Sequence, residues 1–458
     1  MKEGRTGYFY RDTDIEKSSR GFIMQEKKKA RFHVHYAWVI MISCFFFFGL
    51  SMGAFTNTQG LYYAAIAKDL GWNISKVSGC TVFLGLSSVA ALAVVDKIFN
   101  RYDVRPVLFI SQAVFTLTIV LRGFCSQIWQ FSLVYIITGI SSAFLWYVPV
   151  PMLIKNWFKK WTGLALSLSL CSGGIAGFIL NPIFSRMIEK NGWRYTTVFQ
   201  GILMAVVTLP IIALLIRKKP EDMGLTALGA GTQEEKEQSP ENGNISGTQA
   251  KTAAASDASS PKGYLTSPVL RKCFILSIII AFLACLISTI PQQFAHFATV
   301  NGLSASTGAL LVSISMIGNL TGKVTMGPAA DLFGKRKSFA VFFLAASAGM
   351  VLMVIFGTKA GIPLFVGAFL TGIVAPNSGV AVPLLVAEYS DGDAYTFFIS
   401  KVTIAHMVAY AFGSYISSGL YDLTGNYAIP LLTYAAAGIV ALILIFRVLA
   451  SASACRKT

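Results

Sequence analysis

Twelve apolar runs, free or nearly free of charged side chains, recur along the 458 residues. A helix needs about 20 predominantly apolar residues to cross a bilayer. The first six runs contain no Lys, Arg, Asp or Glu and cover 37–60, 77–95, 106–121, 128–150, 161–185 and 195–216. The other six cover 273–299, 304–327, 338–358, 360–385, 395–419 and 423–446, and only two of them contain a charge. This pattern predicts twelve membrane-spanning helices.

Turn signals and charges set the boundaries between runs. Residues 273–322 hold no charged side chain, and Asn301-Gly302 divides them at the distance that one span requires. The third run has only 16 residues, and we expect Arg122 to extend it by reaching the interface with its long side chain. Residues 1–35 are polar and lack the apolar core of a cleavable signal peptide, so the first helix is expected to direct insertion.

A long polar interval, residues 217–268, separates the sixth run from the seventh and is rich in Ser, Gly, Thr and Glu. Such a composition is typical of a disordered linker. We therefore predict an all-α membrane protein of two six-helix bundles, at 36–216 and 269–447, with polar tails at 1–35 and 448–458.

Composition and charge support a membrane protein and predict its orientation. Only 13% of the residues are charged, against about 25% in an ordinary soluble domain. Of the 38 Lys and Arg residues, 29 lie in the tails, the linker and alternate loops, and the opposite loops hold seven. This asymmetry predicts cytoplasmic termini and a cytoplasmic linker, so the net charge of +17 reports topology and not a nucleic-acid partner. The seven cysteines have no metal-ligand spacing, and no metal or cofactor is expected.

Two charges inside the apolar runs are the strongest candidates for chemistry. Lys323 and Lys401 lie in the eighth and eleventh runs, whereas all 21 acidic residues fall in tails, loops or helix ends. An ammonium at membrane depth costs several kcal/mol unless it is paired or hydrated, so these lysines predict a wet cavity and a missing anion. At 1.5 Å per residue, both stand about 10–12 Å from the cytoplasmic face. The alternative is that both side chains reach that face and have no further role.

A loop pattern follows the second run of each half. Residues 327–337 read Gly-Pro-Ala-Ala-Asp-Leu-Phe-Gly-Lys-Arg-Lys, and the first half keeps an acid and bases at the matching place. The chain resembles major facilitator superfamily transporters over essentially its whole length, and 327–337 is similar to their G-x-x-x-D-R-x-G-R-R loop, with Leu332 departing from it. The resemblance implies a gate in which the loop acid pairs with a cation of the other half in one conformation. The gating residues would be Gly327, Asp331, Gly334, Lys335, Arg336, Asp96 and Arg101.

A narrower resemblance comes from residues 156–165, from Gly173 and Gly177, and from 192–194, which are similar to monocarboxylate porters and oxalate/formate antiporters. Those transporters carry a cation eight residues before the loop acid, as Lys323 stands here, and the antiporters carry a lysine that Lys401 resembles. They have Arg at the first of these positions, and an ammonium offers no bidentate fork to a carboxylate. The resemblance therefore implies a carboxylate substrate, but not one that is recognised as a rigid dicarboxylate.

Further polar and aromatic residues in the apolar runs are candidate substrate contacts. Prolines lie near three of these sets, and a proline frees a backbone carbonyl that can face a cavity. The candidates are Asn57, Gln59, Trp146, Tyr147, Gln292, Asn377 and His406. Hydrogen bonding between helices is the alternative role for each of them.

These observations predict a secondary active transporter of a small organic anion, a mono- or dicarboxylate, that works by alternating access through anion exchange or proton-linked cotransport. A carrier of a neutral solute and a non-transporting sensor of the same fold remain alternatives. No nucleophile, metal cluster or carboxylate pair stands at a catalytic spacing, so an enzyme is not expected. The expected partners are the anion and the lipid bilayer, and we expect a monomer in the plasma membrane.

Overall fold

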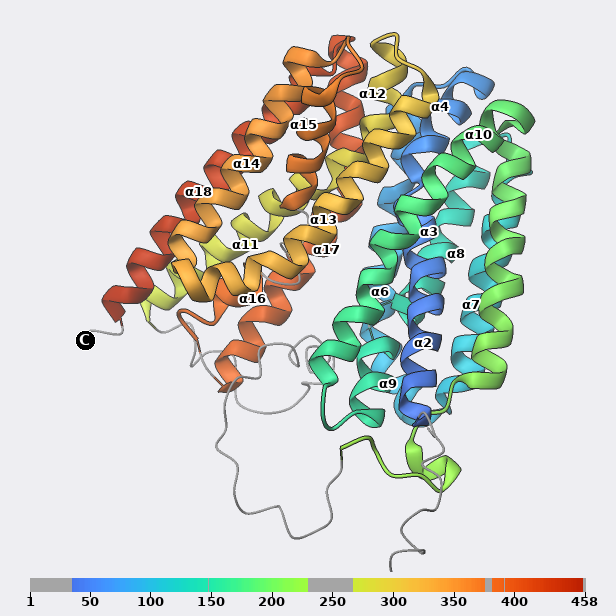
Figure 1. The fold of residues 1–458 in the computed structure, drawn as a ribbon, viewed down its shortest axis with the longest axis vertical. Helices are drawn as coiled ribbons and strands as arrows, with labels where there is room; N and C mark the ends of the chain where they lie inside the picture. The colour runs from blue at the N-terminus through green and yellow to red at the C-terminus, as the bar shows by residue number, and fades with distance from the viewer. Residues whose placement is uncertain (1–34, 147, 230–266, 375–380, 391, 456–458) are drawn as a thin grey trace, which may run out of the picture.

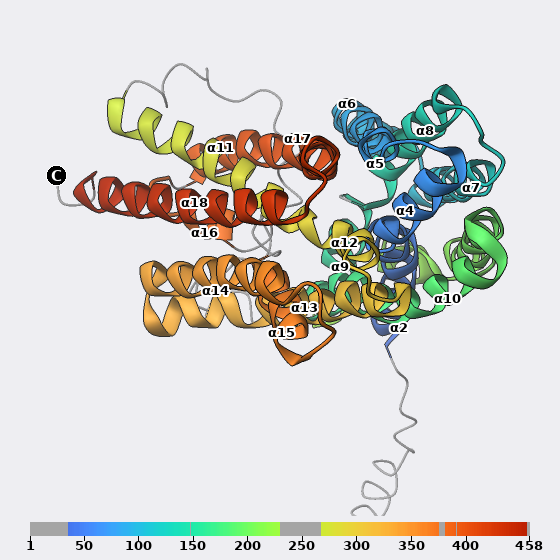
Figure 2. The same ribbon diagram turned by 90° about the horizontal axis from the view of Figure 1, so that it is seen from above.

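The computed structural model describes residues 35–146, 148–229, 267–374, 381–390 and 392–455. These residues are largely helical, and the helices form two groups that lie side by side (Figures 1 and 2). We call the group built from residues 35–229 the N-half and the group built from residues 267–455 the C-half. We call the end of the molecule that holds α4 and α12 the upper end, as it is drawn in Figure 1.

The elements of the N-half follow one another up and down the bundle (Figure 1). They are α2 (Tyr36–Phe48), η1 (Gly49–Gly53), α3 (Ala54–Thr56), α4 (Gln59–Leu70), α5 (Ile74–Ser78), α6 (Cys80–Arg101), α7 (Val104–Arg122), α8 (Ile128–Trp146), α9 (Pro149–Trp157), α10 (Thr162–Pro210), η2 (Ile211–Leu215) and η3 (Pro220–Met223).

The C-half has a corresponding set of elements. They are α11 (Pro268–Thr289), η6 (Ile290–Gln293), α12 (Phe294–Val300), α13 (Ala305–Phe333), α14 (Lys335–Phe356), α15 (Ile362–Ile373), α16 (Ala381–Val386), α17 (Gly392–Thr424) and α18 (Ala428–Cys455).

Ten helical stretches of the described residues are long and apolar enough to cross a membrane. One of them, Thr162–Leu215, turns back at Gly192, where φ is 81°, and therefore supplies two crossings (Figure 1). Glycine allows this backbone conformation because it has no Cβ. The shorter apolar helix α15 supplies a further crossing. The predicted twelve-helix membrane fold is confirmed.

Each half encloses its own hydrophobic core. In the N-half, buried aromatic and aliphatic side chains such as Phe115, Trp157 and Tyr62 form one cluster. In the C-half, Phe339, Phe398 and Tyr434 belong to a second cluster. Two separate cores allow the halves to move relative to each other as bodies, since neither core depends on the other for most of its packing.

The first crossing of each half is interrupted near the upper end. In the N-half, a turn at Asn57-Thr58 separates α3 from α4. In the C-half, the 3₁₀ segment η6 contains Pro291, which has no N–H for the helical ladder. The two interruptions meet across the halves, because a Cβ added to Gly60 would overlap the carbonyl oxygen of Gln292.

The halves contact each other toward the upper end and diverge toward the lower end (Figure 1). Ser78 on α5 donates a hydrogen bond to Ser418 on α17 over 2.9 Å. On the other side of the interface, Ser313 of α13 donates to the carbonyl of Phe178 on α10 over 3.2 Å. The helices of the two halves therefore separate toward the end at which α2 begins (Figure 1).

Two predicted boundaries differ from the structure. Residues 217–229 of the interval expected to be disordered are packed against α9, where the Trp157 indole N–H donates to the Arg217 carbonyl over 2.9 Å and the Leu228 N–H donates to the Trp157 carbonyl. Residues 230–266 lie outside the described part. Helix α18 continues to Cys455, past the expected end at 447, because the Ala-Ser-Ala-Ser-Ala stretch remains helical.

Candidate functional site

Lys323 and Lys401 stand on two C-half helices that contact the N-half. Helix α13 packs against α10, and α17 packs against α5 and α6. Hydrogen bonds join these two helices to the N-half, and N-half glycines pack closely against them. Among the described residues, the α13 and α17 residues in these contacts lie within 305–316 and 411–422. Both lysines lie below these stretches and both side chains are exposed.

The two lysines are not brought together by packing between their helices. Helices α13 and α17 lie on opposite sides of α12 in the view from above (Figure 2). The Cys171 thiol on α10 lies within electrostatic range of Lys323, which places this lysine toward the N-half. Among the described residues, no carboxylate oxygen lies within 4.0 Å of either ammonium. The two positive charges therefore belong to helices on opposite sides of α12 (Figure 2).

A polar cluster closes the upper part of the interface. Gln292 of η6 donates to the Tyr410 hydroxyl on α17 over 3.1 Å and accepts a hydrogen bond from Ser414. Tyr63 on α4 lies beside Ser414, so the cluster spans both halves. Gln292 is therefore held by hydrogen bonds within the C-half as well as by its contact with Gly60.

Arg122 occupies a place that the sequence did not predict. Its side chain is 1% exposed and lies inside the N-half, not at the interface that we expected it to reach. Its guanidinium donates to Gln59 Oε1 over 3.2 Å, to the Tyr135 hydroxyl over 3.4 Å and to Gln200 Oε1 over 3.4 Å. The snorkelling prediction was wrong because three neutral acceptors from α4, α8 and α10 converge on the end of α7.

The same core determines the position of Gln59, which we proposed as a substrate contact. Gln59 is 3% exposed, and its Oε1 accepts hydrogen bonds from Arg122 and from the Tyr135 hydroxyl. Gln200 completes the core by donating from Nε2 to the Ala54 carbonyl over 2.8 Å. The core thus joins the interrupted first crossing to three other helices of the N-half.

The remaining candidate contacts have varied surroundings. The Asn57 amide donates to the Gly173 carbonyl over 2.8 Å, and Gly177 packs against the same side chain, so the small residues at 173 and 177 allow a close helix approach. Trp146 is buried against Phe115. The His406 Nε2 lies 3.5 Å from the Cys285 sulfur. Two candidates, Tyr147 and Asn377, lie outside the described residues.

The expected gate at the lower end has no ion pair between the halves among the described residues. Lys335 pairs with Glu388, and the Arg336 guanidinium lies 4.8 Å from the centre of the Phe446 ring. Both contacts lie within the C-half. Asp331 is exposed on the last turn of α13, Gly327 lies one turn earlier, and Gly334 ends the helix with φ at 83°. In the N-half, Arg101 lies over the Tyr102 ring, whereas the side chain of Asp96 lies outside the described part.

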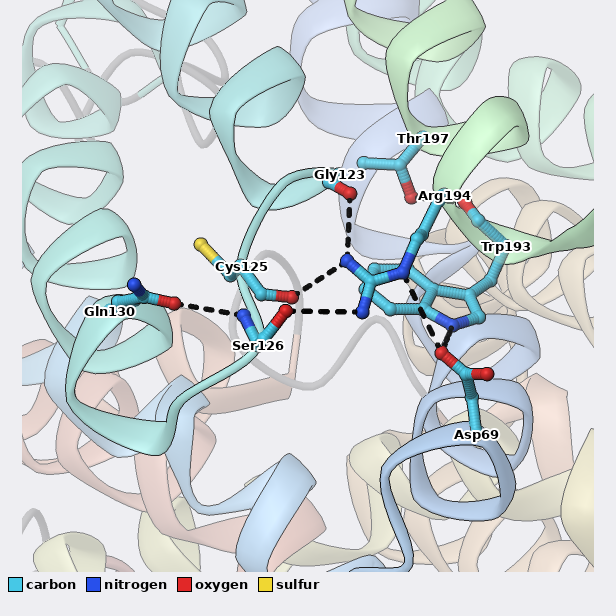
Figure 3. A network of polar contacts seen from close by, with 8 residues as sticks. All are labelled: Asp69, Gly123, Cys125, Ser126, Gln130, Trp193, Arg194 and Thr197. Atoms are coloured by element: carbon cyan, nitrogen blue, oxygen red, sulfur yellow. Dashed lines mark hydrogen bonds and ion pairs between the residues drawn. The ribbon is translucent and has the colours of Figure 1, made fainter.

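A second polar network holds the upper end of the N-half (Figure 3). Arg194 donates to the carbonyls of Gly123 and Cys125, over 3.1 and 2.9 Å, and its Nε lies 3.6 Å from Asp69. The Trp193 indole N–H donates to the same carboxylate over 2.9 Å. Burial raises the pKa of the Cys125 thiol. The network fixes the chain that follows Arg122, so residues 192–194 have a structural role here.

Two six-crossing halves, each with its own core and joined along a polar interface, are the architecture of a membrane carrier. The chain belongs to the major facilitator superfamily, whose sequence pattern matches residues 39–300 and 273–454. Proteins of this family and fold are membrane carriers and not enzymes.

Individual relatives are more distant. Monocarboxylate transporter 12 of Xenopus laevis is 21% identical over 402 residues, which cover 86% of this chain and 84% of that protein. The MFS-type transporter pynF of Aspergillus niger is 24% identical over 189 residues, 40% of this chain, and the match spans only 43% of its length. The crystal structure of a D-xylose-proton symporter has a TM-score of 0.65 at 15% identity, with 89% of this chain and 96% of that chain covered. This last likeness concerns the fold alone.

Proposed function

We propose that the chain is a secondary active transporter of a small organic carboxylate. The observation that carries this proposal is the pair of exposed lysines, Lys323 and Lys401, on the diverging segments of α13 and α17. A charge at this depth is costly unless it is hydrated or paired, and no carboxylate partner lies within 4.0 Å among the described residues. The missing counter-charge is therefore supplied by the transported anion.

The relatives support the same substrate class. The monocarboxylate transporter 12 of Xenopus laevis matches over most of both chains. Lysine ammonium groups act as point charges and hold a carboxylate without fixed geometry. The lysines belong to helices on opposite sides of α12, which suits an anion of charge one or two bound between the halves.

Coupling and orientation belong to the same proposal. The twelve apolar runs of the sequence contain no Asp or Glu that could serve as a proton relay, which favours anion exchange or cotransport in which substrate and lysine share the proton. The distribution of Lys and Arg favours a cytoplasmic lower end. The structure would then represent the inward-open state. The proposal also includes a monomer in the plasma membrane.

The proposal is tested by counterflow in proteoliposomes. Formate, lactate, pyruvate, oxalate, malonate and succinate are compared with a sugar and a cationic amino acid. We expect exchange of at least one carboxylate and none of the sugar or the cation. Uptake of the sugar or the cation without any response to a carboxylate would overturn the proposal.

Variants of the two lysines test the residues themselves. We expect Lys323→Ala and Lys401→Ala each to abolish carboxylate uptake, because each removes a counter-charge, while Lys323→Arg retains part of it. Lys359→Ala, which removes an exposed lysine from the loop before α15, is the matched control and should transport normally. Wild-type uptake in either alanine variant would mean that the lysine extends to the lower surface and does not bind the substrate.

A neutral solute is the second candidate. The cluster of Gln292, Tyr410 and Ser414 offers hydrogen-bonding groups of the kind that recognise hydroxyl-rich molecules. The D-xylose-proton symporter of similar fold carries a sugar. In that case Gln292→Ala would abolish uptake of the sugar, and Lys323→Ala would leave it intact.

A further inference from the structure

The Arg122 core of the N-half carries a positive charge that nothing in its described surroundings neutralises. An arginine stays protonated in proteins because its pKa exceeds about 12. Among the described residues, no carboxylate lies within 4.0 Å of the guanidinium, and its hydrogen bonds go to the neutral oxygens of Gln59, Tyr135 and Gln200. A buried arginine with only neutral partners has lost its water without gaining a counter-ion.

Aromatic contacts offset only part of that loss. The guanidinium carbon lies 4.7 Å from the centre of the Tyr62 ring and 5.7 Å from that of Phe55. A cation–π contact recovers part of the lost hydration, but an ion taken out of water is fully compensated only when it also gains a counter-charge. The balance leaves a site that would gain free energy from an anion.

Hydrogen-bond donors around the guanidinium are also unused. Among the described residues, Arg122 Nε, Gln59 Nε2 and the Tyr62 hydroxyl have no hydrogen-bond partner, although all three atoms are buried. These donors belong to residues that are at most 3% exposed. Buried polar groups are usually paired, so several unused donors around one cation indicate an acceptor that is bound in another conformation.

One side of this site borders the contact between the halves. Gln59, Gly60 and Tyr63 lie on the first two turns of α4, where Gly60 touches the Gln292 carbonyl and Tyr63 lies beside Ser414 of α17. A carrier of this fold must separate these surfaces when it opens its upper end. That movement uncovers α4 at Gly60 and Tyr63, with Gln59 and Arg122 directly behind them.

We propose that Arg122, Gln59 and Tyr63 form an anion-binding site of the upper-open conformation. The anion accepts hydrogen bonds from the Gln59 amide and the Tyr63 hydroxyl, and Arg122 supplies the charge. Its identification as a small carboxylate rests on the proposed function. Lys323 and Lys401 then attract the anion from the lower end, and the Arg122 site attracts it from the upper end.

Glycines at the contact provide a way to expose the site. Gly60→Ala introduces a Cβ that would overlap the Gln292 carbonyl, and Gly85→Ala introduces one that would overlap Ala411 of α17, so each substitution opposes closure of the upper end. Gly419→Ala is the matched control, because a Cβ there meets nothing within 4 Å. The use of two opening variants keeps the test valid if one of them folds poorly.

The experiment measures binding of L-lactate and oxalate to full-length protein in nanodiscs by calorimetry at constant ionic strength. We expect Gly60→Ala or Gly85→Ala to bind at least one of them more tightly than Gly419→Ala does. Adding Arg122→Gln to either opening variant should weaken binding by about tenfold or more, since the positive charge that attracts the anion is lost. Adding Arg122→Lys should restore part of the affinity.

A purely structural role for Arg122 predicts a different result. Arg122→Gln would then lower the thermal unfolding midpoint and leave the affinity of the opening variants unchanged, which would overturn the inference. Failure of the proposed function is seen separately, as the absence of carboxylate counterflow in the wild-type protein. Binding that depends on Arg122 without any such counterflow would reject the transport proposal and retain the anion site.

Discussion

Asp69 links two side chains of the network at the upper end of the N-half (Figure 3). It accepts a hydrogen bond from Trp193 and pairs with Arg194, but both charged side chains are substantially exposed, at 50% and 39%. An exposed ion pair contributes about 0–1 kcal/mol, and a net hydrogen bond contributes about 0.5–1.5 kcal/mol. We expect Asp69→Ala to destabilise the protein by about 1 kcal/mol, measured as a lower thermal unfolding midpoint. Glu189→Ala removes an exposed acid near the same end and should change nothing; an equal effect of both variants would contradict a specific role for Asp69.

The intramembrane charges show what could be predicted at the scale of residues. Lys323 and Lys401 were identified because they interrupt apolar runs, and their exposure on the interface helices agrees with a hydrated site. Arg122 stands at the end of a run, so its position alone favoured the membrane surface. Its burial depends on Gln59 and Gln200, which are distant in sequence and meet it only in the folded bundle. A single sequence does not reveal which distant polar groups converge on a charge.

At the level of helix packing, Gly372 allows α13 and α15 to approach each other closely. A Cβ added there would overlap the carbonyl of Ser315, which is backbone and cannot rotate away. We expect Gly372→Ala to destabilise the C-half by about 1–3 kcal/mol, the usual effect of overpacking a well-packed core. Gly419→Ala, which meets open space in α17, should be neutral or slightly stabilising. Thermal unfolding of the purified variants checks both, and equal midpoints would show that α15 can shift at little cost.

The positions of the helices were easier to predict from the sequence than their ends and interruptions. The turn at Asn301-Gly302 was predicted, and α12 indeed ends at Val300 before α13 begins at Ala305. The first crossing was expected to end near residue 60, yet α4 carries it on to Leu70, with Lys68 and Asp69 on its last turn. Hydropathy locates the apolar part of a helix and not its polar extension. The interruption at Asn57-Thr58 was also missed, because contacts such as that of Asn57 with the Gly173 carbonyl are tertiary.

The orientation of the whole molecule rests on the distribution of Lys and Arg, which predicts that the lower end is cytoplasmic. In a cysteine-free background, we expect Pro240→Cys in the central linker to react with a membrane-impermeant maleimide only after the cells are permeabilised. A cysteine at Lys359, in the loop before α15, should react in intact cells and serves as the control. Reaction at position 240 from outside would reverse the assignment of the lower end.

The proposed transport requires the upper contact between the halves to separate, because alternating access moves one bundle against the other around a central site. The hydroxyls of Ser78 and Ser418 lie 2.9 Å apart across that contact. Cysteines at these two positions would therefore be close enough to form a disulfide. We expect oxidation of the Ser78→Cys/Ser418→Cys protein to stop counterflow and dithiothreitol to restore it, since the bond holds the upper end closed. The matched control is Ser88→Cys/Ser142→Cys, whose hydroxyls lie 3.4 Å apart within the N-half, so a disulfide there should leave transport intact. Full counterflow by a completely cross-linked Ser78→Cys/Ser418→Cys protein would show that transport does not require the halves to part at this point.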